Sequence, residues 1–526
     1  MIRGCQLIGD RDSQQGTETF HTLAAASGER LPGCFHEATD DEVNTALELA
    51  EAHADTLRFL SILERARLLE LICDSVERSR HEIEERCLLE AGYPSERVGM
   101  EFERMIHLWK VFANEVRLGH GLDARIDHSD PDRQPMPKPD LRSMRVAVGS
   151  VVVFGASNFP LALSVGGSDV ISALGAGCPV VVKGHPSHPG TSELLGRAVL
   201  RGIQDAGLPS GIFSLIQGRA HEVGLALAKH PFTRAVGFTG SLRGGRALMD
   251  AASSRPDPIP VYAEMGSVNP QFVFPEILTA DAEGFAKQLF ASVTMGNGQF
   301  CTCPGVIVVP DGADCDAFVR AYQKIISNSG AMPFLNPGIA EAYEAGVADW
   351  RTSCQAKLHR SPQRGGPVLA EVSWEMFLVH RKALLEEVFG PSTVLIRCPN
   401  PDAFLEAAKM FPGQLGTSIH GTKDELTSVA KPLLAALQRF AGRIVINGFP
   451  TGIETAYAMQ HGGPYPATSD PLHTSLGLAA LARWARPVCF QNVPEELLPD
   501  ALKEANPLGI RRLVEGEWSE ATRSDL

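Results

Sequence analysis

The sequence predicts an α/β protein of two or three domains, the first of them built around a mostly parallel, Rossmann-like sheet. Two stretches predict this class. Between residues 144 and 263, and again between 264 and 463, short apolar runs of strand character alternate with segments of helical spacing. The length agrees, because 526 residues are too many for one small core. Such sheets bind ligands near the carboxyl ends of their strands, so we expect functional residues there.

Residues 37–118 are predicted to be helical. Thr39 or Asp40 is the candidate cap of the first helix, since acidic residues occupy its first turn. Helical spacing continues up to Gly92-Tyr93-Pro94, which is a stop signal. Residues 123–143 are rich in proline and charge, and we expect them to form a linker or an extended arm.

The first alternation follows this arm. Its expected strands are MRVAVGSVVVFGAS, CPVVVKGH, IFSLIQG and TRAVGFTGS, and its expected helices are SVGGSDVISALGAG, TSELLGRAVLRGIQDAG, HEVGLALAKH and LRGGRALMDAASS. The second alternation has strands in QFVF, PGVIVV, STVLIRC and RIVING and a helix around DAFVRAYQKIISNSG. A loop-rich tail, which includes HGGPYPATSDP, is expected after it.

Charge and hydropathy exclude several classes of protein. A net charge of −14 offers no basic stripe for phosphates, so nucleic acid is not expected as a partner. No apolar run approaches the length of a membrane span, and the N-terminus lacks the apolar core of a signal peptide. The eleven cysteines follow no framework spacing, which is typical of reduced thiols. We therefore expect a cytoplasmic protein.

The stretch GQFCTCPG places two thiols, Cys301 and Cys303, one residue apart. A metal site would need further ligands, and no second C-x-C or C-x-x-C supplies them; no metal is expected. A disulfide between residues i and i+2 is strained. Two interpretations remain: one reactive cysteine, or a pair of buried structural thiols. Glycines 296 and 298 would let a ligand approach a reactive cysteine closely.

Three further positions could carry chemistry. No GxGxxG follows a strand, but Gly240-Ser241 precedes a helix and could hold a phosphate, or could simply cap that helix. Asn158, which follows a strand, could donate to an oxyanion or bond its own turn. Glu264 ends an apolar strand and could be a general base with a raised pKa, or a salt-bridged residue at a domain junction.

These positions, taken in order, resemble the aldehyde dehydrogenase superfamily. The motifs that carry the resemblance are SNFP, a lysine after an apolar strand, FTGS, Glu-x-Gly at a strand end, GQ-x-C and E-x-FGP, spread over residues 20–500. KGHPSHPGTSEL, VYAEMGSVNP, NGFPTGIETA and HGGPYPATSDP are similar to the branch that holds α-ketoglutaric semialdehyde (2,5-dioxovalerate) dehydrogenases and an NADP-dependent fatty aldehyde dehydrogenase. Ser157 and Gly266-Ser267 depart from the mainstream branch.

The resemblance implies roles for single residues. Cys301 would be the nucleophile and Cys303 a bystander, Glu264 the base, and Asn158 the oxyanion donor together with the backbone N–H of Cys301. The positions implied to contact the cofactor are Lys183, Pro186, Gly240, Ser241, Glu387 and Phe389. Because Pro186 stands where many NAD-preferring relatives carry a glutamate that repels a 2′-phosphate, we expect NADP, with NAD possible.

The implied fold has a Rossmann-like cofactor domain (residues 1–122 and 144–263), an α/β catalytic domain (264–463), and a small oligomerisation arm with a tail (123–143 and 484–526). The implied reaction is oxidation of an aldehyde to an acid through a Cys301 thiohemiacetal and thioester, with 2,5-dioxovalerate as the expected substrate. A medium- or long-chain fatty aldehyde dehydrogenase, a coenzyme A-acylating enzyme and a non-catalytic scaffold are the alternatives. The family pairs subunits, so we expect a homodimer or homotetramer.

Overall fold

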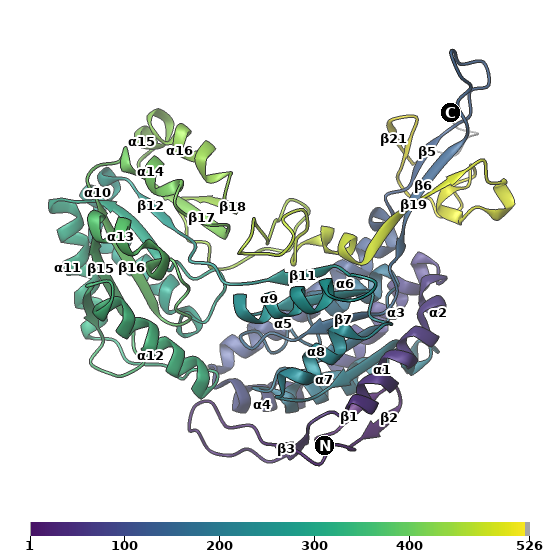
Figure 1. Ribbon diagram of the computed structural model, residues 1–526, viewed down its shortest axis with the longest axis horizontal. Helices are drawn as coiled ribbons and strands as arrows, with labels where there is room; N and C mark the ends of the chain where they lie inside the picture. The colour runs from purple at the N-terminus through teal and green to yellow at the C-terminus, as the bar shows by residue number, and fades with distance from the viewer. Residues whose placement is uncertain (1, 521–526) are drawn as a thin grey trace.

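A computed structural model describes residues 2–520 and contains three larger sheets and a two-stranded one. Two of the larger sheets have seven strands each and form separate α/β lobes, while a five-stranded sheet projects as an arm (Figure 1). The predicted α/β class is therefore confirmed. No helix within residues 2–520 is both long enough and apolar enough to cross a bilayer.

The first lobe contains the predicted parallel sheet. Its strand order is β11-β10-β7-β8-β9-β1-β2, in which β7 to β11 run parallel and β1 and β2 add an antiparallel edge. The strands are β1 (Gln6–Ile8), β2 (Arg11–Ser13), β7 (Val151–Phe154), β8 (Val180–Lys183), β9 (Phe213–Ile216), β10 (Ala235–Thr239) and β11 (Val261–Glu264). The sequence prediction missed β1 and β2, which are too short to show a period.

Helices cover both faces of this sheet, as parallel strands buried on both sides require. The helices are α1 (Asp40–Ala52), α2 (Ala54–Arg58), α3 (Ile62–Arg78), α4 (Arg80–Ala91), α5 (Ser95–Leu118), α6 (Ser168–Ala176), α7 (Pro189–Asp205), α8 (His221–Lys229) and α9 (Leu242–Ser253). Thr39 caps α1 in a capping box with Glu42, and Gly92 ends α4 in the left-handed conformation. Both predicted boundaries are confirmed.

The second lobe has the strand order β14-β15-β16-β13-β12-β17-β18 and is parallel except for β14. Its strands are β12 (Gln271–Val273), β13 (Val306–Pro310), β14 (Lys357–Arg360), β15 (Val368–Ser373), β16 (Ser392–Cys398), β17 (Gln414–His420) and β18 (Ala441–Ile446). Its helices are α10 (Pro275–Thr294), α11 (Ala313–Ser327), α12 (Pro337–Thr352), α13 (Trp374–Leu384), α14 (Ala403–Ala408), α15 (Lys423–Ser428) and α16 (Ala430–Leu437). The predicted strands QFVF, PGVIVV, STVLIRC and RIVING are all present.

The arm is a sheet of order β19-β6-β5-β20-β21, which joins the proline-rich segment to the C-terminal part of the chain. Its strands are β5 (Arg125–Asp127), β6 (Leu141–Ala147), β19 (Ala485–Gln491), β20 (Arg512–Val514) and β21 (Glu517–Ser519). Strand β6 pairs with β19 as far as Ala147, so the arm sheet extends beyond the boundary predicted at residue 143.

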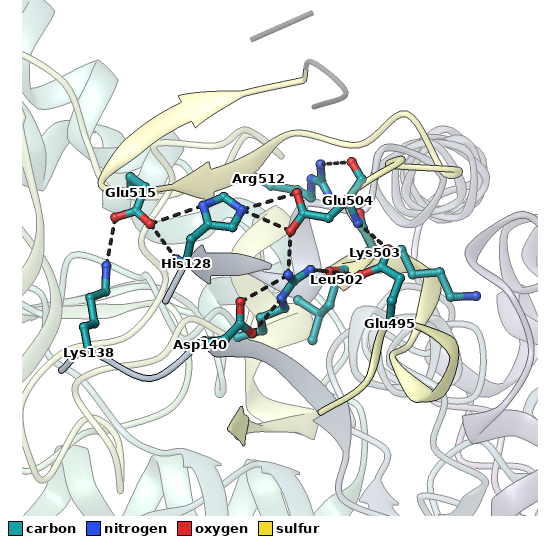
Figure 2. Close-up of polar contacts among 10 residues, drawn as sticks. His128, Lys138, Asp140, Glu495, Leu502, Lys503, Glu504, Arg512 and Glu515 are labelled. Carbon is teal, nitrogen blue, oxygen red and sulfur yellow. Dashed lines mark hydrogen bonds and ion pairs between the residues drawn. The ribbon is translucent and has the colours of Figure 1, made fainter. Parts of the chain in front are cut away.

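Charged side chains fasten the C-terminal segment to the arm. His128 lies between Glu504 and Glu515, with ring nitrogens 3.0 and 3.2 Å from their carboxylate oxygens, and Lys138 pairs with Glu515 at 2.9 Å (Figure 2). Arg142 is buried and donates to the Leu502 carbonyl at 2.6 Å. These contacts hold together segments more than 350 residues apart in the sequence.

The two lobes meet at the end of β11. The chain leaves the first sheet there, and a loop-rich segment after β18 returns across it before the arm (Figure 1). Glu264, the last residue of β11, makes an antiparallel bridge with Thr468 of that returning segment, and Ser469 accepts and donates hydrogen bonds with β11. The carboxyl end of the first sheet is thereby covered by residues from far along the sequence.

Candidate active site

Cys301 lies on a tight loop that a single asparagine holds in place. The Asn269 side-chain amide donates to the carbonyl oxygens of Cys301 and Cys303 at 2.8 and 2.9 Å. Gly298, three residues before Cys301, has a positive φ of 66°, and a Cβ there would lie 2.2 Å from the carbonyl oxygen of Gly390. Only glycine fits this approach, so the loop is fixed against the second lobe.

The two thiols of this loop point into different surroundings. Cys301 is partly exposed and lines a cavity of ≈ 80 Å³. Cys303 is buried in the apolar core that contains Val293 and Phe300, and its Sγ lies 3.7 Å from the Val293 carbonyl oxygen. All eleven cysteines are free. Cys301 is therefore the more accessible of the two thiols and lies at the larger of the two cavities.

Glu264 and a histidine from the returning segment lie beside Cys301, and the histidine lines the same cavity as the thiol. His461 Nε2 lies 3.0 Å from Glu264 Oε1 and 3.6 Å from Cys301 Sγ. Ser475 donates to the other carboxylate oxygen of Glu264 at 2.5 Å. Glu264 and His461 are each only 3% exposed, so this polar cluster is almost entirely shielded from bulk water.

The pKa of Glu264 is lowered, which corrects the predicted raised value. Burial does raise it, but the charge and hydrogen bond of His461 and the hydrogen bond from Ser475 outweigh burial. The prediction failed because the sequence did not reveal these two partners. Glu264 is consequently a carboxylate at neutral pH and can accept a proton.

The pKa of the Cys301 thiol is shifted in the opposite direction. Burial, followed by the negative charges of Glu264 and Glu387, raises its pKa well above the ordinary value. Cys301 therefore rests as a protonated thiol, and its activation needs a nearby proton acceptor. Glu264 is such an acceptor, since one of its carboxylate oxygens lies within 4.8 Å of Cys301 Sγ.

Asn158 lies in the loop after β7, next to the nucleophile loop. Its side-chain amide donates to the Gln299 carbonyl at 3.0 Å, two residues before Cys301, and its own carbonyl accepts from Tyr93. An amide nitrogen carries two hydrogens, so one N–H remains for a ligand oxygen. The bond to Gln299 differs from the local turn that was the alternative interpretation, and the oxyanion role stays a prediction.

Glu387 lines a second, smaller cavity, which Cys303 also lines. Burial raises the pKa of Glu387 to about 7, and the backbone N–H of Ser267 lies 3.4 Å from its Oε1. Phe389 and Ser267 line the same cavity. A Cβ at Gly266 would come within 2.8 Å of the Glu387 carboxylate, so the glycine at this position makes the approach possible.

Lys183 ends β8 at the carboxyl edge of the first sheet, as predicted. Its ammonium group donates to the carbonyl oxygens of Gly184, at 3.0 Å, and of Gly218. Burial lowers the pKa of Lys183 to about 8, against the opposing charge of Glu37. Pro186 follows on the partly buried turn that leads to α7. A cation at this edge suits the ribose or phosphate of a dinucleotide.

Ser241 is the N-cap of α9, with its Oγ accepting from the Gly244 N–H at 3.2 Å. The capping interpretation is thus confirmed, and it does not exclude phosphate binding, because the helix N-terminus still presents backbone N–H groups beside an exposed surface. The Gly240 N–H donates to the Glu264 carbonyl at 3.0 Å, which ties this turn to β11.

Besides Ser475, two residues of the site were not identified from the sequence. His461 belongs to HGGPYPATSDP, a motif whose histidine had no assigned role. Arg104 lies on α5, among residues predicted only as helical, and lines the same cavity as Cys301 and His461. A histidine followed by two glycines in a loop-rich tail was a usable signal for the first. A single arginine on an amphipathic helix gave none for the second.

The structure places a partly exposed cysteine beside a carboxylate, between two α/β lobes, with a buried lysine at the edge of the Rossmann-like sheet. This is the arrangement expected of a dinucleotide-dependent enzyme with a thiol nucleophile. Residues 11–464 match the model of the aldehyde dehydrogenase family. The chain belongs to the aldehyde dehydrogenase family, and it is an NAD(P)-dependent dehydrogenase.

Curated relatives and solved structures agree with this assignment. The chain is 42% identical to alpha-ketoglutaric semialdehyde dehydrogenase 2 of Azospirillum brasilense, over 98% of this chain and 99% of that protein. It is 40% identical to alpha-ketoglutaric semialdehyde dehydrogenase of Acinetobacter baylyi, over 98% of each. Lactaldehyde dehydrogenase from Escherichia coli shares the fold, with a TM-score of 0.79 and 21% identity over 93% of this chain and 99% of that one.

Proposed function

We propose that the chain oxidises 2,5-dioxovalerate to 2-oxoglutarate. Relatives at 40 and 42% identity over nearly the whole chain carry the name of this activity. The supporting observation in the structure is a cation in the substrate cavity. Arg104 and Cys301 line the same space of ≈ 80 Å³, and Phe159, Leu163, Ile453 and Leu476 form apolar walls between polar groups. A short aldehyde with a terminal carboxylate matches that arrangement.

Arg104 has hydrogen-bonding capacity to spare. Among residues 2–520 it donates to a single protein acceptor, the Ile453 carbonyl at 2.6 Å, and a guanidinium carries five N–H donors. It is close enough to Cys301 for their charges to interact. Arg443 is held in the same region by the Gly452 carbonyl at 2.9 Å. Arg104 would thus pair with the substrate carboxylate while the aldehyde carbon reaches Cys301.

The chemistry begins with transfer of the Cys301 proton to Glu264 and attack of the sulfur on the aldehyde carbon. Asn158 and the Cys301 backbone N–H stabilise the oxyanion; removal of one such donor typically lowers the rate by about 10²–10³. A bound nicotinamide supplies the hydride acceptor that turns the thiohemiacetal into a thioester. Glu264 must first release the thiol proton to solvent; as a carboxylate again, it takes a proton from water, which hydrolyses the thioester to the acid.

This last step separates the proposal from coenzyme A acylation. An enzyme that passes its acyl group to a thiol has less need of a carboxylate to activate water. Glu264 is oriented for that task by His461 and Ser475, which hold both of its oxygens. Hydrolysis is therefore the favoured fate of the thioester.

Replacement of Arg104 tests the substrate. Arg104→Met removes the charge and keeps the length of the side chain, so kcat/KM for 2,5-dioxovalerate is expected to fall about 10- to 100-fold, as for loss of a charge-assisted hydrogen bond. Decanal, which has no carboxylate, serves as the matched substrate and is expected to change by less than about threefold. An equal loss with both aldehydes, or a wild-type preference for decanal, would contradict the proposed substrate.

We infer a preference for NADP over NAD, since no carboxylate stands at Pro186 to repel a 2′-phosphate and Lys183 is cationic at neutral pH. Glu37 counteracts this preference. Its carboxylate accepts from the backbone N–H groups of Arg219, at 2.8 Å, and Ala220, and its charge acts on Lys183. Both cofactors are therefore expected to bind, and fluorescence titration with each one measures the ratio.

We also propose a cytoplasmic homodimer or homotetramer. The free cysteines fit a reducing compartment. Strand β18 ends the second sheet, and all six of its residues are partly or fully exposed; β19 likewise ends the arm sheet with exposed residues. Two such open edges pair by sheet extension between copies. Light scattering coupled to size exclusion would refute this if the chain were monomeric at micromolar concentration.

A further inference from the structure

The cluster at the cavity end combines three donor atoms of the types that zinc prefers. Cys301 Sγ, His461 Nε2 and a Glu264 carboxylate oxygen lie within 4.8 Å of one another. Thiolate, imidazole and carboxylate are the three ligand types of protein zinc sites. The three residues come from a loop of the second lobe, from the segment that returns across the lobes, and from the end of β11.

The separations also suit zinc. With Zn–S near 2.3 Å and Zn–N and Zn–O near 2.0–2.2 Å, ligand atoms of a tetrahedral ion lie about 3.3–3.6 Å apart. His461 Nε2 is 3.6 Å from Cys301 Sγ and 3.0 Å from Glu264 Oε1. Small side-chain shifts would complete the geometry, while the carboxylate is already oriented through its other oxygen by Ser475.

The fourth position of a tetrahedral ion would face the substrate cavity. Cys301 and His461 both line that cavity, which provides a route of entry and room for a water ligand. Glu264 closes the opposite side and is 3% exposed. Catalytic zinc sites have three protein ligands and keep the fourth position for water or substrate, whereas structural sites use four protein ligands.

We propose that Cys301, His461 and Glu264 form a zinc-binding site that holds the enzyme in an inhibited state. The ion displaces the thiol proton of Cys301. It also replaces the proton that His461 Nε2 donates to Glu264, so His461 binds as a neutral imidazole whose single ring proton lies on Nδ1. The sulfur lone pair needed for attack then belongs to the metal, and the base is coordinated as well. Zinc and aldehyde thus exclude each other, and a chelator restores the nucleophile.

This site differs from the metal site considered for GQFCTCPG. That alternative required both thiols, but Cys303 points into the core toward Val293 and away from the cluster. The ligands that complete the site lie 37 residues before and 160 residues after Cys301, a spacing that no sequence motif reveals. Inhibition rests on the proposed dehydrogenase function, whereas metal binding does not.

The test uses the full chain after removal of metal with a chelator. Cobalt(II) is titrated in and followed by its thiolate-to-metal charge-transfer absorption, and zinc affinity is measured by displacement of the cobalt. Loss of an outer-shell partner typically costs about 10- to 100-fold in metal affinity, so His461→Asn, which removes a direct ligand, is expected to lose more than about 100-fold. Glu264→Gln is expected to weaken binding similarly, and Cys301→Ser abolishes the band.

Cys303→Ala is the matched control and keeps wild-type affinity. Each variant is first shown by circular dichroism and cofactor titration to be folded. Wild-type cobalt affinity in both His461→Asn and Glu264→Gln would overturn the site, as would a band that persists in Cys301→Ser. A metal-free wild-type enzyme that binds cobalt as expected but oxidises no aldehyde would refute the proposed function and leave the zinc site standing.

Discussion

The two sides of the loop that carries GQFCTCPG meet opposite environments. On the cavity side, Cys301 faces a carboxylate, an imidazole and space for a ligand. On the core side, Cys303 packs among apolar residues and is 8% exposed. The backbone of the loop is the same for both, and Asn269 holds the two carbonyl groups alike.

The comparison shows that neither thiol is intrinsically activated. Burial raises the pKa of both, to about 12 for Cys303 and well above the ordinary value for Cys301. What distinguishes Cys301 is a carboxylate and an imidazole beside its sulfur and a place at the larger of the two cavities. Reactivity here belongs to the cluster and not to the cysteine alone.

The largest effect should come from the cavity-side thiol. Cys301→Ala removes the atom that forms the covalent bond, so kcat is expected to fall by at least about 10⁴-fold. Cofactor affinity, measured by fluorescence titration, should stay within about twofold, since the proposed dinucleotide groove begins at Lys183 and Ser241 on the other lobe. Residual turnover above a tenth of the wild-type rate would show that another group is the nucleophile.

Replacement of the base separates the two half-reactions. Glu264→Gln should lower steady-state turnover by about 10²- to 10⁴-fold, because water is no longer deprotonated. A stopped-flow trace should still show one equivalent of reduced cofactor, formed slowly, before the reaction stalls. If no burst occurs and no acyl-enzyme accumulates, no other group can replace Glu264 in removing the thiol proton, and acylation as well as hydrolysis depends on this carboxylate.

The pH dependence of kcat tests the influence of His461 on the base Glu264. His461 lowers the pKa of Glu264, so in His461→Asn the pKa of Glu264 rises and the carboxylate protonates at higher pH. Activity that depends on the ionised base is then lost sooner as pH falls. We expect about a 10-fold loss of kcat at the acidic end of the profile and a smaller loss at the alkaline end. A profile lowered equally at every pH would indicate a purely structural role.

The core-side thiol should matter least. Cys303→Ala leaves a small space in the core and is expected to destabilise the fold by about 1 kcal/mol, with kcat within about threefold of wild type. Thermal unfolding and steady-state rates measure the two effects. A loss of turnover as large as that of Cys301→Ala would remove the distinction between the two sides of the loop.

The sequence was sufficient to predict the features that depend on a local pattern of residues. Thr39, Gly92 and the alternating strands and helices were identified because capping, positive φ and periodicity act over a few residues. The pairing of β1 with β9 was missed, since it joins segments about 200 residues apart through strands of three and four residues.

The same distinction applies to the candidate site: residues marked by local sequence were predicted, and residues that depend on distant contacts were not. Cys301 and Glu264 stand beside glycines and strand ends that mark them, but the partners that set their protonation do not. His461 and Ser475 reach Glu264 across about 200 residues, and Arg104 enters the cavity from a helix that otherwise shows only core spacing. The lowered pKa of Glu264 could not be predicted, because it is a property of contacts made only in the folded chain.

The central claim is that the sulfur of Cys301 is acylated by the aldehyde. The direct measurement is mass spectrometry of peptides from Glu264→Gln quenched in acid during turnover with 2,5-dioxovalerate and NADP. The claim predicts one acyl group, lost on treatment with hydroxylamine, on Cys301 and none on Cys303. An acyl group on Cys303, or an unmodified loop while reduced cofactor forms, would contradict it.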